Sequence, residues 1–223
     1  MPMRTVVTGP FQENCYLVWA EGASTALLID PGDDPALLQA AVEEQQLQVA
    51  LILLTHGHLD HIGAVDAMRD YSSAPAVATA GERELIAWYP ESCRMFGLAE
   101  RPAPTIDHWL PNDATELPDE IAALLPEGPA VMIHQTPGHT AGGVTYQIDT
   151  NLFTGDTLFK QSIGRTDLPG GDLATLAASL AKLVSLDDAL KVYPGHGDAT
   201  TIGQEKLNNR YIEQLVPAEQ LGG

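Results

Sequence analysis

The feature that most constrains the fold is a cluster of three histidines and one aspartate within six positions, directly after the apolar run 49–54. Its members are His56, His58, Asp60 and His61. An imidazole costs free energy to bury unless both ring nitrogens find partners, so this density predicts a shared positive partner. Histidines two residues apart cannot share one helix face. We therefore expect His56 and His58 in an extended turn at the carboxyl end of a strand, where open α/β sheets place ligands.

Other strand-end loops repeat this chemistry. His139 lies in "TPGHT", Asp156 in "FTGDT" and His196 in "YPGHGD", each beside a glycine that lets the backbone turn sharply and leaves room for an ion. We expect Asp60 and His61 to point away from His56 and His58, which offers two neighbouring pockets from one turn. Neutral imidazoles and carboxylate oxygens are ligands of zinc-like ions. These loops therefore predict a catalytic metal site, with room for two ions.

Strand-like and helical segments alternate in both halves of the chain, which predicts an α/β layered single domain over 1–223. The strand-like segments are 4–9, 15–20, 25–30, 49–54, 74–79, 129–135, 144–149, 151–155 and 189–194, and the helical ones are 35–46, 62–71, 81–89, 172–186 and 202–215. The proline-rich stretch at about 88–129 lacks a clear period. We expect an irregular excursion or partial lid there, because structureless connections of that length are uncommon without a task.

Composition narrows the classes of partner. The formal charge of −19 argues against a nucleic-acid backbone or an anionic membrane surface as partner. Because the sequence shows no secretion signal and no apolar stretch long enough to span a bilayer, we expect a soluble, cytoplasmic protein. Cys15 and Cys93 are too few for a disulfide framework and are expected as free thiols. The sequence makes no prediction of the oligomeric state.

The set of polar residues resembles the complete ligand signature of the metallo-β-lactamase superfamily, over about residues 5 to 200. The set is His56, His58, Asp60, His61, His139, Asp156 and His196. The resemblance implies a four-layer αββα sandwich with two divalent metal ions at one edge. It also implies that His56, His58 and His139 hold the first ion, that Asp60, His61 and His196 hold the second, and that Asp156 bridges both with a hydroxide. Zinc is the expected metal, with iron or manganese as alternatives.

Within the superfamily, "SCRMFGL" at 92–98 and "GRTDLPGGD" at 164–172 resemble short, single-domain bacterial hydroxyacylglutathione hydrolases, also called type II glyoxalases. That resemblance implies hydrolysis of a glutathione thioester such as S-lactoylglutathione to glutathione and a hydroxy acid. The chemistry agrees with it, because a thiolate, whose conjugate acid has a pKa of about 8.5, leaves without a strong general acid.

Three other activities and a non-catalytic role stay open. A persulfide dioxygenase shares the fold and the segment 164–167 but uses one iron, at positions that correspond to His56, His139 and Asp156. A lactonase or β-lactamase is less favoured, the latter because the sequence shows no export signal. A non-catalytic protein would be marked by a lost ligand, and none of the seven is lost.

Residues outside the ligand set carry weaker predictions. Asp30 in "LLIDPG" matches a position that braces the metal-binding loop in the family, or else it caps a turn. Arg165 either clasps a substrate carboxylate or pairs with Asp167, and Lys160 is a weaker candidate for the same contact. His108 and His134 are interpreted as structural or surface residues.

Overall fold

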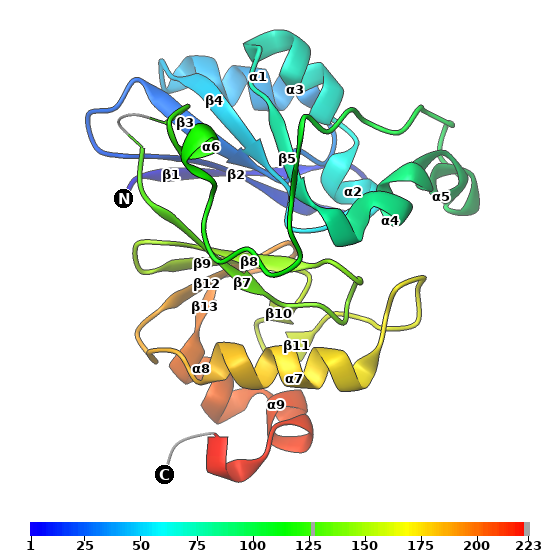
Figure 1. Ribbon diagram of the computed structural model, residues 1–223, viewed down its shortest axis with the longest axis vertical. Coiled ribbons are helices and arrows are strands. Elements are labelled where there is room, and N and C mark those ends of the chain that lie inside the picture. Colours follow the sequence, from blue (N-terminus) through cyan, green and yellow to red (C-terminus); the bar gives the residue numbers. More distant parts are fainter. Residues whose placement is uncertain (126–127, 221–223) are drawn as a thin grey trace.

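The computed structural model describes residues 1–125 and 128–220, and its layers are two facing sheets covered by helices on both outer sides (Figure 1). The first sheet has the order β1(Met3–Thr8), β2(Glu13–Trp19), β3(Thr25–Ile29), β4(Gln48–Leu53), β5(Ala76–Thr79) and β6(His108–Leu110). The strands β1 to β3 pair antiparallel, and β3 to β6 pair parallel.

The second sheet has the order β13(Thr200–Thr201), β12(Lys191–Pro194), β9(Asn151–Gly155), β8(Val144–Ile148) and β7(Val131–Gln135). The pair β9 and β12 is parallel, and the other neighbours are antiparallel. A small hairpin of β10(Leu158–Phe159) and β11(Ser162–Ile163) follows β9.

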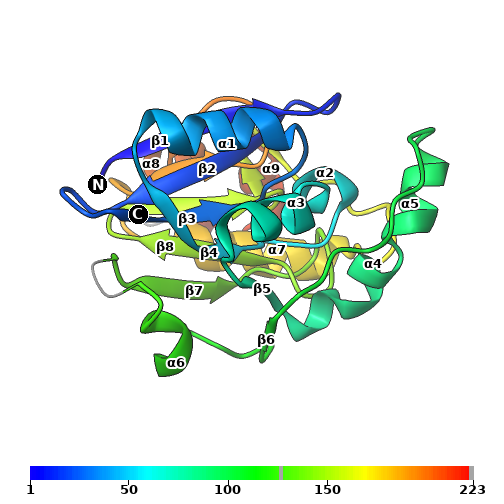
Figure 2. The same cartoon turned by 90° about the horizontal axis from the view of Figure 1, so that it is seen from above.

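Helices cover the outer face of each sheet. In Figure 1, α1(Pro35–Glu44) and α3(Val65–Ser72) lie above the first sheet, and α7(Leu173–Val184), α8(Ile202–Asn208) and α9(Arg210–Leu215) lie below the second. Figure 2 shows α1 and α3 in front of the sheets and α7 behind them. The shorter elements are α2(Leu59–Ile62), η1(Ala80–Glu82), α4(Arg83–Ala87), α5(Tyr89–Met95), α6(Asp119–Ala122) and η2(Ala218–Gln220).

Strand alternation divides the apolar side chains among three cores. In β2, Leu17 packs against the helices above the first sheet, whereas Tyr16 and Val18 pack between the sheets. In β9, Phe153 joins that middle core and Leu152 packs against α7. This confirms the predicted αββα sandwich. We propose that the chain forms a single domain, because strands from both halves share the middle core.

The expected excursion at about 88–129 is more regular than predicted. It contains α5 and α6, and β6 pairs parallel with β5, so that Val77 lies opposite His108 and Thr79 opposite Leu110. The prediction of irregular structure was wrong for these elements. A proline in the first turn of a helix is favourable, since its missing N–H has no helical acceptor there, and Pro90 occupies such a position in α5.

Within the described residues, no helix combines the length and the apolar character needed to cross a bilayer.

Candidate metal centre

The topology brings four loops to one edge of the two sheets. Asp156 directly follows β9 and His196 follows β12; because these strands pair in parallel, with Pro194 opposite Gly155, both residues emerge side by side. His139 follows β7, which runs in the same direction as β9 because both are antiparallel to β8. The loop after β4 joins this edge where the backbone N–H of Val144 donates to the carbonyl of Thr55 (2.9 Å).

The first donor triad consists of His56, His58 and His139, which are all buried. One donor atom from each lies within 4.8 Å of the others, and Nε2 of His139 is 2.9 Å from Nδ1 of His58. As expected, His56 and His58 lie in an extended turn after β4. Burial, and then the neighbouring imidazoles, lower the pKa of His56 well below its ordinary value, which favours the neutral form that binds metals.

The second donor triad consists of Asp60, His61 and His196, again with donor atoms within 4.8 Å of one another. Asp60 and His61 lie in the short helix α2 rather than in the turn itself. Nε2 of His196 is 3.2 Å from Oδ2 of Asp60. Burial lowers the pKa of His61, but Asp156 and Asp30 raise it by more, so the net pKa is above its ordinary value.

Asp156 lies between the two triads. Its Oδ1 is 3.4 Å from Nε2 of His61, and its Oδ2 is 3.6 Å from Nε2 of both His139 and His196. Burial raises the pKa of Asp156, but the three imidazoles lower it by more, which keeps the carboxylate ionised. Gly195 makes this approach feasible, because a Cβ there would overlap both Asp156 and His61.

Orphaned polar atoms show that the site fits cations. The buried atoms Nε2 of His56, His58 and His61, and Oδ1 of Asp156, have no hydrogen-bond partner. A buried donor or acceptor without a partner costs about 1 to 3 kcal/mol, so such a cluster needs a ligand. A set of imidazoles and carboxylates suits divalent ions of the zinc type. The chemistry of the donors and their convergence therefore both fit two ions.

Asp30 holds the far side of both triads. Its Oδ1 accepts the backbone N–H of Thr55 (2.7 Å), and its Oδ2 accepts both the hydroxyl of Thr55 and Nδ1 of His61, the latter at 3.0 Å. Since the Thr55 hydroxyl has a single proton and gives it to Asp30, its oxygen accepts Nδ1–H of His56 (3.0 Å). The Nδ1–H of each imidazole is thus engaged by an oxygen, and Nε2 is the nitrogen without a hydrogen-bond partner. These contacts support the interpretation of Asp30 as a brace for the histidine loop, which stays a proposal.

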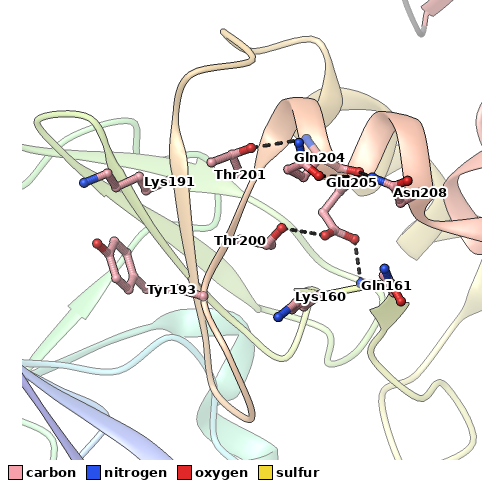
Figure 3. A pocket seen from close by; sticks show the side chains of 10 residues that line it. Lys160, Gln161, Lys191, Tyr193, Thr200, Thr201, Gln204, Glu205 and Asn208 are labelled. Carbon is pink, nitrogen blue, oxygen red and sulfur yellow. Dashed lines mark hydrogen bonds between the residues drawn. The ribbon is translucent and has the colours of Figure 1, made fainter.

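Arg165 and Lys160 are each engaged with a carboxylate. Nε and Nη2 of Arg165 donate to the two carboxylate oxygens of Asp167, both at 2.7 Å, while its backbone carbonyl accepts Nδ1–H of His139 (2.7 Å). Nζ of Lys160 donates to Asp198 at 3.0 Å. Lys160 lines a separate cavity of about 360 Å³, together with Thr200 and Glu205. Figure 3 shows these side chains around it.

A cavity of about 230 Å³ opens onto the donor triads. Its polar wall carries Arg165 and five of the seven donors, and its apolar wall is formed by Phe11, Leu59, Phe96 and Leu168. The rings of Phe11 and Phe96 pack edge to face with centroids 5.8 Å apart. Sequence reasoning missed Phe11, whose only signal is an aromatic residue in a turn, where polar residues and glycine dominate.

Sequence reasoning also missed Thr55 and Glu13. Thr55 directly precedes the histidine cluster, and a hydroxyl-bearing residue at that position is the sequence signal that could have identified it. Glu13, at the start of β2, is fully buried 3.9 Å from Nδ1 of His61 and accepts the hydroxyl of Thr8 (2.9 Å). His134 bonds Gln147 on the neighbouring strand (2.7 Å), in keeping with a structural interpretation.

Comparisons with known proteins agree with this fold. The family model described as "Metallo-beta-lactamase superfamily" matches residues 8–196. Hydroxyacylglutathione hydrolase GloC of Haemophilus influenzae is 37% identical over 217 residues, which cover 95% of this chain and 98% of the relative. The crystal structure of BLEG-1 B3 metallo-beta-lactamase has a TM-score of 0.85 at 38% identity, covering 95% of this chain and 99% of that one.

Two further solved structures are similar over most of their length. TTHA1623 in a di-iron-bound form has a TM-score of 0.81 at 36% identity and covers 93% of this chain and 99% of that one. ETHE1 from Myxococcus xanthus has a TM-score of 0.74 at 25% identity, with 99% of both chains covered. These similar proteins carry different names, so the substrate must be argued from the site itself.

Proposed function

Because the chain belongs to the metallo-beta-lactamase superfamily, we propose that it is a hydroxyacylglutathione hydrolase. It cleaves S-(2-hydroxyacyl)glutathione, such as S-lactoylglutathione, to glutathione and a hydroxy acid. The observation that carries the proposal is the contact of Asp156 with both donor triads. The hydroxyacylglutathione hydrolase of 37% identity supports the choice of substrate.

In this proposal His56, His58 and His139 hold one divalent ion, Asp60, His61 and His196 hold the other, and Asp156 contacts both. Such ions lower the pKa of water to about 7 and polarise a carbonyl group. Asp30 and Thr55 keep the protons of His61 and His56 on Nδ1, so that Nε2 faces the ions. The residues of the chain thus supply a fixed, pre-oriented donor set.

The cavity itself favours a thioester. Among its lining residues outside the proposed ligand set, Arg165 is the one ionisable group, and a guanidinium is a poor proton donor. An amide nitrogen needs a proton to leave, whereas a thiolate departs unaided. Phe11, Phe96 and Leu168 exclude water from one side of the cavity and offer an apolar surface to the acyl group.

The experiment is an assay of thiol release from S-lactoylglutathione under anaerobic conditions, with zinc, iron and manganese quantified on the same sample. We expect hydrolysis at an unchanged rate without oxygen, and two ions per chain. Oxygen uptake with glutathione persulfide, one iron per chain and no thiol release would instead identify a persulfide dioxygenase. Cleavage of lactones or β-lactams without cleavage of the thioester would also overturn the proposal.

A further inference from the structure

Glu82 is a buried carboxylate that the proposed chemistry does not use. It ends η1, directly after β5, and only 1% of it is exposed. A buried carboxylate is costly unless its oxygens are hydrogen-bonded, so the partners of Glu82 indicate what it is for.

Both partners lie in loops that carry histidines of the first triad. Oε2 of Glu82 accepts the backbone N–H of Gly57 (2.7 Å), and Gly57 separates His56 from His58. Oε1 accepts the backbone N–H of Gly142 (2.6 Å), in the loop that carries His139. One carboxylate therefore joins the histidine loop of the first sheet to the histidine loop of the second.

The backbone around Glu82 is built for this close approach. A Cβ at Gly57 would lie 2.7 Å from Cγ1 of Ile86 and 3.1 Å from Oε2 of Glu82. A Cβ at Gly142 would lie 2.7 Å from the backbone of Gly81. The hydroxyl of Thr79 also donates to the carbonyl of Gly142. Side chains at either glycine would push the two loops away from the carboxylate.

We infer that Glu82 is a positioning residue of the first metal site, which sets the spacing between the pair His56 and His58 and the opposite donor His139. The inference rests on the proposed metal-dependent function. It adds an anchor that shares no partner with Asp30 and acts through two backbone N–H groups.

Glu205 offers a matched control for a purely structural role. It is also 1% exposed, and it accepts the N–H of Gln161 (2.7 Å), the hydroxyl of Thr200 (2.7 Å) and Nδ2 of Asn209 (2.9 Å). Figure 3 shows two of these bonds, from Thr200 and Gln161. None of its three partners belongs to the donor triads or is next to a triad residue in the sequence.

The test compares Glu82→Gln with Glu205→Gln. In Glu82→Gln an amide NH₂ faces a backbone N–H, so one of the two anchors is lost. We expect affinity for the first zinc ion, measured by competition with a chromophoric chelator, to fall about 10- to 100-fold. We also expect an altered visible spectrum of the Co²⁺ form. Glu205→Gln should lower the melting temperature of the metal-free protein at least as much, with metal affinity and the Co²⁺ spectrum unchanged.

Wild-type affinity in Glu82→Gln would overturn the inference, as would a loss of affinity in both variants in proportion to their loss of stability. If Glu82→Gln does not fold, Thr79→Val removes the other side-chain bond to Gly142. It should weaken the first ion several-fold, and an unchanged affinity would count against the inference.

Failure of the inference differs from failure of the proposed function. A wild-type protein that binds two ions and cleaves no thioester would refute the substrate and leave the role of Glu82 to be decided by metal affinity. A wild-type protein that binds no ion would refute both.

Discussion

The two donor triads differ in depth and in charge. His56, His58 and His139 are buried, and the outer nitrogens of His56 and His139 meet neutral partners, the hydroxyl of Thr55 and the carbonyl of Arg165. In the second triad the outer nitrogen of His61 meets the carboxylate of Asp30. The side chains of Asp60 and His196 are 19% and 28% exposed.

This contrast indicates that the two sites hold their ions with different strength. The first triad is a buried set of imidazoles whose lowered pKa values favour the neutral form. The second combines an anionic donor with an outer carboxylate, and two of its three members are partly exposed. We therefore expect the first ion to be held more permanently and the second to exchange more readily with the solution.

Asp156→Asn should remove the difference between the two triads, because it weakens both. Because Asp156 contacts both triads, its loss should weaken both ions and lower kcat by more than the roughly 100-fold typical of losing an outer partner. The measurements are metal content after gel filtration and thioester turnover. A variant that keeps two ions and full activity would end the assignment of Asp156 as the shared ligand.

Asp30→Asn should affect both triads, more strongly the second. The amide can no longer accept all three bonds that the carboxylate accepts from Thr55 and His61. We expect about 10- to 100-fold weaker binding of the second ion and a smaller loss at the first, both measured by chelator competition. Asp33→Asn, in the same loop, is the control and should bind both ions normally. Equal affinities in the two variants would mean that Asp30 only shapes the turn.

Thr55→Val should affect the first triad and leave the second unchanged. The substitution removes the hydroxyl between His56 and Asp30 and leaves the bond from His61 to Asp30 in place. The first ion should bind about tenfold more weakly and the second as in the wild type. Titration with Co²⁺ would resolve the two sites by their spectra, and a selective loss of the second ion would contradict this interpretation.

The smallest effect is expected from Arg165→Ala. His139 contacts the backbone carbonyl of Arg165, so metal binding should not change. If the guanidinium leaves Asp167 for a carboxylate of glutathione, KM for S-lactoylglutathione should rise about tenfold with kcat nearly unchanged. A simple acyl thioester without carboxylates provides the control, and an equal loss on both substrates would exclude this contact.

Sequence reasoning identified the candidate metal ligands, because their residue types and their neighbours in the sequence already indicate metal binding. Five of the seven donors stand beside glycines at strand ends, Asp60 and His61 follow in α2, and all seven meet at one edge. The strands that carry them are long enough and apolar enough to be recognised. Helix α7 was likewise predicted, and its cap is observed, since Asp172 accepts the N–H of Thr175.

What sequence reasoning missed depends on tertiary contacts. The three residues of β6 form a strand only because β5 supplies backbone partners at the sheet edge. The role of Glu82 arises from two glycine N–H groups that are far from it along the chain. The sequence left open whether Arg165 pairs with Asp167 or with a substrate, since each of these partners offers a carboxylate group.

Each triad draws two donors from the first half of the chain and one from the second. During synthesis at the ribosome, the emerging first half displays only pairs of donors, which hold ions weakly. If the proposed ligand sets are right, the first site is complete only when His139 docks and the second only when His196 does. The loop of His196 is held where Tyr16 and Asn14 donate hydrogen bonds to the carbonyl of Pro194. Under this proposal the two ions would bind in the order in which the chain is synthesised, and because each would join donors of both halves, they would stabilise the packing of the two sheets.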